Sequence, residues 1–130
     1  MVETTATAKS PADVFRKLAE LLAAKKFADA AQLYAEDVEV RNPFAPDGPT
    51  ASRGREAVAA FFSNSTVKSL EFTDVSLIEG IDGETVVAEF DMSMMGAEGT
   101  PFKLPSVFVL RVRDGLIVES RDYVGPRRAG

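Results

Sequence analysis

The C-terminal half of the chain contains two Asp-Gly pairs, and each pair stands between two stretches rich in β-branched and aromatic residues. Such stretches favour β-strands, here over residues 70–79, 85–95, 102–113 and 116–124. An Asp-Gly pair favours a tight hairpin turn, because both central residues of that turn adopt positive φ angles. Asp82-Gly83 and Asp114-Gly115 therefore predict hairpins, and the four strands predict an antiparallel meander.

The N-terminal half predicts three helices. Ser10, Pro11 and Asp13 form a strong helix start, with the serine as N-cap and the aspartate closing a capping box. A third helix is expected from about Arg55 to Ser63. The first two helices are indicated by apolar residues at helical spacing, namely Val14, Phe15, Leu18, Leu21 and Leu22, and then Phe27, Ala30, Ala31, Leu33 and Tyr34.

A short strand over residues 38–40 and a turn-rich segment over residues 41–54 separate the last two helices. Three of the seven prolines lie in that segment, so we expect a shaped loop there. The order of elements predicts an α+β fold, in which three N-terminal helices pack on one face of a strongly bent antiparallel sheet. A single domain is expected over residues 11–124, with a disordered N-terminal tail over 1–10 and a C-terminal tail over 125–130.

Composition excludes several kinds of chemistry. The chain has no Cys and no His, so it offers no thiol nucleophile, histidine base or usual zinc site. Acid–base chemistry would depend on Asp, Glu, Tyr, Lys or water. The net charge of −5 argues against nucleic acid or an anionic membrane as the main partner. No phosphate loop, metal motif or cofactor fingerprint is found, so we expect no cofactor.

The N-terminal sequence MVETTATAKS lacks the apolar core of a signal peptide, and the chain contains no apolar run of membrane-spanning length. We therefore expect a cytoplasmic protein.

The stretch VVAEFDMSMM places two carboxylates, Glu89 and Asp91, on one face of a predicted strand. In one interpretation these carboxylates lie on a solvated sheet face or pair with Arg and Lys side chains. In the other they line a pocket, where desolvation and mutual repulsion would raise the pKa of at least one of them. Leu104, Phe108 and Leu110 are assigned to the carboxylate side, which would give that side the mixed lining of a ligand pocket. The opposite face is strongly apolar and needs a cover; its residues are Val86, Ala88, Phe90, Met92 and Met94, with Val107, Val109, Ile117 and Tyr123.

Over residues 11–124 the order of elements resembles the nuclear transport factor 2-like superfamily, which includes SnoaL-like polyketide cyclases and ketosteroid isomerases. The resemblance is carried by FADAAQLYAEDVEVRNP, GREAV and VFVLRVRDGLIVESRDYVG. It implies a cystatin-like cone whose helices and concave sheet face enclose a pocket for a small molecule. It also implies that the opposite sheet face often forms a dimer.

Among similar proteins, the limonene-epoxide hydrolases have two Asp residues and an Asn at the positions of Asp91, Asp122 and Asn42. Glu89 and Val40 stand where those hydrolases have an Arg and a Tyr. The ketosteroid isomerase base, tyrosine and protonated aspartate would fall at Asn42, near Leu18 and near Phe108. The resemblance thus implies a retained Asn–Asp–Asp set without the isomerase groups.

These observations lead to one leading hypothesis and one alternative. The leading hypothesis is a cofactor-free acid–base isomerase, cyclase or epoxide-hydrolase-type enzyme that acts on a small apolar molecule, with Asp91, Asp122 and Asn42 as catalytic residues. The alternative is a ligand-binding or dimerisation module without catalysis. Substrate contacts are expected from Leu18, Tyr34, Phe62, Glu89, Leu104, Ser106 and Phe108, and a homodimer is expected through the face of Val86, Ala88, Phe90, Met92 and Met94.

Overall fold

The computed structural model describes residues 10–129, which form three helices and one seven-stranded mixed sheet. The predicted disorder of the N-terminal tail falls on residues 1–9, outside the described residues. Within residues 10–129 no helix is both long enough and apolar enough to cross a membrane. The elements are α1 (Pro11–Ala23), α2 (Phe27–Ala31), β2 (Tyr34–Asn42), β3 (Thr50–Arg53), α3 (Arg55–Ser63), β4 (Ser69–Glu79), β5 (Thr85–Met95), β6 (Pro101–Arg113), β7 (Leu116–Val124) and β8 (Arg128–Ala129).

The predicted N-cap and start of the first helix are confirmed. The backbone N–H of Asp13 donates to the Oγ of Ser10 at 3.1 Å, which satisfies one free donor of the first turn of α1. The second helix is shorter than expected, because α2 ends at Ala31 and Tyr34 begins β2. Tyr34 pairs with Ile117 of β7, so sheet pairing overrides its helical spacing.

The C-terminal meander is confirmed, and the sheet is wider than the meander alone. Its strand order is β3-β2-β7-β6-β5-β4, with β8 paired to β6. β2 runs parallel to β7, which makes the sheet mixed. Part of the segment predicted as a loop also joins the sheet, because Thr50–Arg53 pairs with the end of β2.

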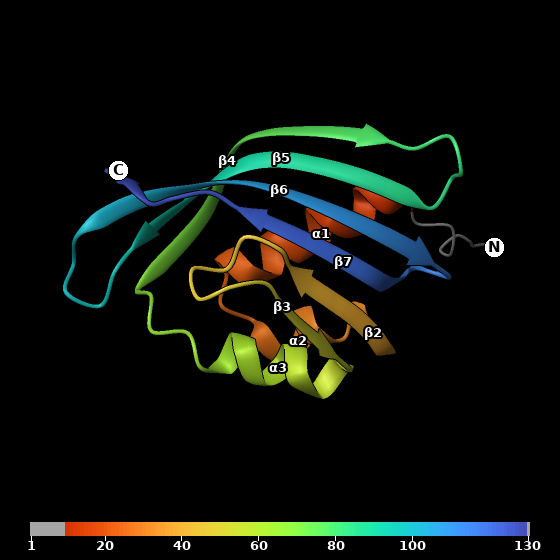
Figure 1. Ribbon diagram of the computed structural model, residues 1–130, viewed down its shortest axis with the longest axis horizontal. Coiled ribbons are helices and arrows are strands. Elements are labelled where there is room, and N and C mark those ends of the chain that lie inside the picture. The colour runs from red at the N-terminus through yellow and green to blue at the C-terminus, as the bar shows by residue number, and fades with distance from the viewer. Residues whose placement is uncertain (1–9, 130) are drawn as a thin grey trace.

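Helix α1 crosses one face of the sheet, whereas α2 and α3 lie beside its β2–β3 edge (Figure 1). The ring of Phe15 lies 5.4 Å from that of Phe90 and 5.9 Å from that of Phe72, measured between centroids. Val86 and Ala88 are fully buried under this helix. We call the face toward α1 the inner face and the opposite one the outer face.

The prediction of a dimer through this apolar face of β5 was wrong, because α1 covers the face within one chain. Val86, Ala88 and Phe90, with exposed fractions of 0%, 0% and 3%, lie in the core of a single chain. Met92 and Met94 point to the same face of β5 as these three residues and are half-buried. The apolar face does need a cover, and the chain's own helix supplies it.

The register between β5 and β6 corrects a second prediction. Ala88 pairs with Phe108, and Phe108 pairs with Asp122, so these three side chains share the inner face. Glu89 pairs with Val107 on the outer face. Across the five-residue loop over 96–100, Met95 pairs with Pro101. A loop one residue longer or shorter would turn every side chain of β6 to the opposite face of the sheet. Leu104, Phe108 and Leu110 therefore face the helices, as expected, but without Glu89 and Asp91.

Candidate active site

Polar side chains gather on the inner face where β2 and β7 run in parallel. Val40 pairs with Ser120 and Arg41 with Arg121, so the next step along both strands brings Asn42 beside Asp122. We call Tyr34, Asn42, Ser120 and Asp122 the inner polar cluster. Because side chains alternate along a strand, Ser120 and Asp122 point to the same face.

Asp122 is the ionisable group of this cluster whose pKa lies closest to neutral pH. Burial raises the pKa of its carboxyl to about 6, and a hydrogen bond from the Ser120 hydroxyl to Oδ1 partly opposes that rise. A carboxyl with a pKa near neutrality can both accept and return a proton under physiological conditions. The residue as a whole is half-buried, so part of its surface meets solvent.

Tyr34 is the second titratable member of the cluster. Its side chain is buried, with 5% of its surface exposed. Burial raises the pKa of the Tyr34 hydroxyl, and the negative charge of Asp122 raises it further. The phenol therefore stays protonated and can act as a hydrogen-bond donor. The Tyr34 ring meets that of Phe62 edge-on, with 6.0 Å between the ring centroids, and Arg55 Nε donates to the backbone carbonyl of Tyr34 at 2.8 Å.

Asn42 presents a polar atom that the protein leaves free. Its Oδ1 is buried, and within the described residues it has no hydrogen-bond partner. A buried acceptor without a partner costs roughly 1–3 kcal/mol. A bound water, an ion or a polar group of a ligand would satisfy such an atom.

Apolar side chains surround the cluster. Phe108 lies directly opposite Asp122 in the β6–β7 ladder, and Phe62 and Leu104 are half-buried. Ser106 is buried and donates to the carbonyl of Leu104 at 3.0 Å. Leu18, with no exposed surface, is a core residue of α1 rather than an accessible wall.

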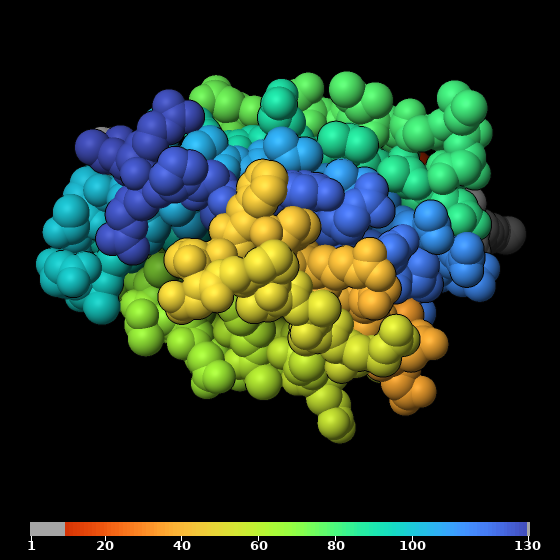
Figure 2. Space-filling model, viewed as in Figure 1, coloured from red at the N-terminus to blue at the C-terminus, as the bar shows by residue number. Residues whose placement is uncertain are grey.

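Asp91 and Glu89 lie on the outer face and do not join the cluster, contrary to the prediction. They line a groove of about 430 Å³ together with Asp74, Pro105 and Val107. The wall of this groove is completed by Phe44, whose ring lies 5.4 Å from that of Tyr123. Figure 2 shows the loop after β2 (yellow) lying over the C-terminal strands (blue). Asp91 and Asp122 therefore cannot act on one ligand from the same side.

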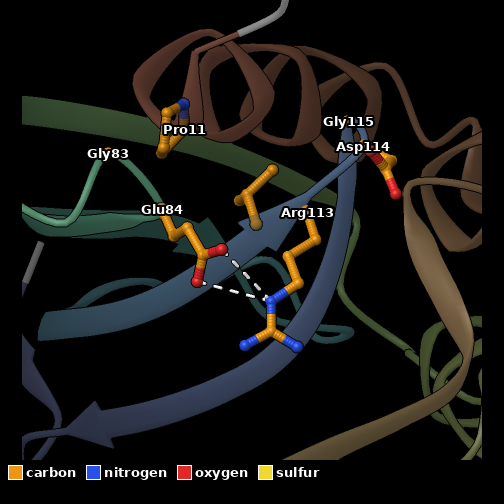
Figure 3. Close-up of a pocket in the computed structure, with 7 residues that line it drawn as sticks. Pro11, Gly83, Glu84, Arg113, Asp114 and Gly115 are labelled. Atoms are coloured by element: carbon orange, nitrogen blue, oxygen red, sulfur yellow. Dashed lines mark hydrogen bonds and ion pairs between the residues drawn. The ribbon is translucent and has the colours of Figure 1, made fainter.

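A second hollow of about 350 Å³ lies between the two Asp-Gly hairpins and the start of α1. Figure 3 shows the side chains of Glu84 and Arg113 pointing toward each other in it. Arg113 Nε donates to both carboxylate oxygens of Glu84, at 3.4 and 3.2 Å. Two of the three charged side chains that line this hollow thus pair with each other, and none of the predicted site residues lies in it.

Residues 10–129 contain no group of three His, Cys, Asp or Glu side chains that could hold a metal ion. The chemistry that the inner polar cluster can offer is proton transfer by a carboxyl and hydrogen bonding by a phenol and an amide.

Ser120 is the member of the cluster that the sequence analysis missed. Its signal is the spacing Ser-x-Asp on a strand, which places a hydroxyl and a carboxyl on the same face. That signal is weak without the fold, because it does not tell which face is buried.

Fold and site together define an α+β cone with a buried carboxyl among aromatic side chains. The sequence pattern of the SnoaL-like domain matches residues 15–120, and the chain belongs to this family. It is 28% identical over 118 residues to the uncharacterized protein YesE of Bacillus subtilis, covering 88% of this chain and 80% of that one.

Solved structures agree with this fold. A Bacillus subtilis protein provisionally named an isomerase is 27% identical, with a TM-score of 0.81 over 89% of this chain and 86% of that one. The epoxide hydrolase/cyclase-like enzyme SalBIII, from pyran ring formation in salinomycin, has a TM-score of 0.76 at 17% identity, over 92% and 95% of the two chains. The latter likeness concerns the fold alone.

Proposed function

We propose that this protein is a cofactor-free enzyme that transfers a proton within a small, mostly apolar molecule, with Asp122 as the acid–base group. The observation that carries this proposal is the inner-face carboxyl of Asp122, whose pKa is raised to about 6 by burial. The isomerase name of the similar Bacillus subtilis structure supports the same class of reaction.

The reaction begins with Asp122 as a base. At pH 7 a carboxyl with this pKa is ionised in about nine of ten molecules. It takes a proton from a carbon next to a carbonyl: the C–H bond breaks, its electron pair moves into the enolate, and an O–H bond forms on Asp122. The protonated hydroxyl of Tyr34 donates to the oxygen on which negative charge develops.

The second half of the reaction decides between two products. If the substrate has a double bond next to that carbon and Asp122 returns the proton to the far end of it, the double bond moves and the molecule is isomerised. If the enolate carbon attacks a second carbonyl of the same molecule, a ring closes and Asp122 protonates the new alkoxide. Water addition to an epoxide by a pair of carboxylates is disfavoured, because Asp91 lies on the outer face.

Hydrogen–deuterium exchange tests the proposal without knowledge of the substrate. A panel of small cyclic ketones and β-dicarbonyl compounds is incubated with the protein in D₂O, and deuterium incorporation is followed by NMR. We expect exchange at the α-carbon that falls by about 10²–10⁴ in Asp122→Asn, as for loss of a general base. The matched control is Asp91→Asn, which should exchange like the wild type. Equal exchange in the wild type and Asp122→Asn would refute the proposal.

A non-catalytic ligand-binding module is the second candidate. The free Oδ1 of Asn42 favours it, because an unpaired buried acceptor serves binding as well as catalysis. This candidate gains if a panel compound binds the protein, and loses its affinity in Asn42→Leu, while no exchange occurs.

We further propose a homodimer through the outer face. Half-buried valines, Val107 and Val109, form its centre on β6. Arg121 lies beside Val109 on one side, and Glu89 lies beside Val107 on the other. A two-fold axis in the interface, perpendicular to the diagonal from Arg121 to Glu89, would place each Arg121 over the partner's Glu89.

A further inference from the structure

Ser120 stands at the centre of β7, where its side chain is enclosed by neighbouring strands. It pairs with Leu110 of β6 and Val40 of β2, and only 1% of its surface is exposed. Leu110 itself is fully buried. A buried hydroxyl in apolar surroundings is costly unless it forms a hydrogen bond. The bond that this hydroxyl forms is with Oδ1 of Asp122, two residues further along the strand.

The consequence concerns the two oxygens of the carboxyl. A serine hydroxyl has one proton to donate, and here it is directed to Oδ1. A carboxylate can exchange a proton through either oxygen, but an oxygen that already accepts a buried hydrogen bond is the poorer base. Oδ2 is the oxygen left for a substrate. We infer that Ser120 is a positioning residue, which holds Asp122 so that proton transfer takes place through Oδ2.

This inference rests on the proposed function for its catalytic meaning, but the positioning itself can be measured without substrate. The Ser120 bond favours the ionised carboxylate, whereas burial favours the neutral carboxyl. Of the other side chains that face Asp122, Tyr34 is titratable and neutral, and Asn42, Val40 and Phe108 are uncharged. Removal of the Ser120 hydroxyl should therefore change the acidity of Asp122 with little interference.

The experiment is a ¹³C-carboxyl NMR titration of Asp122 in the full-length, substrate-free protein. In Ser120→Ala we expect the Asp122 pKa to rise above its wild-type value by about 1, as for loss of one hydrogen bond to a charged group. Ser120→Thr keeps the hydroxyl and should restore the wild-type titration. Ser120→Cys, of similar size but a weak donor, should shift the pKa in the same direction as Ser120→Ala. It provides the measurement if the alanine variant does not fold.

Ser106→Ala is the matched control. Ser106 is also a buried serine of the inner face, but its hydroxyl bonds to the Leu104 carbonyl, so its removal should leave the Asp122 titration unchanged. An unchanged titration in Ser120→Ala and Ser120→Cys would overturn the inference. If instead the titration shifts but deuterium exchange does not depend on Asp122, the positioning is retained and the proposed function fails. If exchange depends on Asp122 and the titration does not shift, only the inference fails.

Discussion

Phe108 and Asp122 are direct partners in the ladder between β6 and β7, so an aromatic ring lies beside a carboxyl on the inner face of the sheet. The ring of Phe108 in turn meets that of Phe90 edge-on at 5.0 Å, which continues the apolar lining toward α1. A charge on Asp122 is thus formed next to groups that solvate it poorly. The free energy of unfolding should depend on pH for this reason.

The first prediction concerns the stability of Asp122→Asn. The folded pKa of about 6 lies above the ordinary value of 3.8, so the folded protein binds this proton more tightly than the unfolded chain does. The stabilisation that results is fully present below pH 4 and is lost as the pH rises through 6. Each pKa unit corresponds to about 1.4 kcal/mol; with allowance for partial solvent access, the stability of Asp122→Asn relative to wild type should rise by roughly 2 kcal/mol between pH 4 and pH 7.5. Urea unfolding at the two pH values measures this difference. A constant difference would show that burial does not perturb Asp122.

The second prediction tests which face of β5 is the core. Phe90 packs against Phe15 and Phe72 within one chain, so Phe90→Ala should lower the free energy of unfolding by roughly 3–5 kcal/mol. Thermal or urea unfolding at a low protein concentration is the measurement. The control is Val87→Ala, one residue away on the outer face, which should cost much less. If Phe90→Ala changed only the oligomeric state, the core assignment would be incorrect.

The local elements were predictable because their signals are local. Ser10 caps α1 through a contact that spans three residues. Asp114 and Gly115 both have positive φ, 52° and 77°, as the tight turn requires. The bounds of α3 and of strands β4 to β7 follow from such signals to within a residue, whereas β2 begins four residues before the predicted strand and β3 lies within the predicted loop.

The faces of the sheet were not predictable in the same way. Alternation shows that Glu89 and Asp91 share a face, but it does not show which face the helices cover. The register across the loop 96–100 depends on loop length, and Gly99 there adopts φ 89° without a diagnostic turn sequence. Ile117 reaches the inner face because the β6–β7 pairing shifts register between Arg111 and Val112, as at a β-bulge, and the sequence gives no clear sign of that shift.

The third prediction tests the outer-face dimer by charge exchange. Arg121→Glu and Glu89→Arg should each weaken the dimer, because like charges then face each other across the interface. The double variant should restore it, since both pairs are re-formed with opposite polarity. Light scattering coupled to size exclusion distinguishes a dimer from the 14.0 kDa monomer. A wild-type protein that stays monomeric at high concentration would contradict the proposal.

The last prediction concerns Asn42. Its buried Oδ1 has no hydrogen-bond partner in the described residues, so Asn42→Leu removes an unsatisfied acceptor and adds apolar contact in a side chain of similar size. We expect the free energy of unfolding to rise by about 1 kcal/mol, while exchange or ligand binding at the inner polar cluster is lost. The same substitution at the exposed Asn64 serves as control and should change neither quantity appreciably. A destabilised Asn42→Leu would mean that the amide already has a partner in solution, such as an ordered water molecule, and that the cluster is less prepared for a ligand than its geometry indicates.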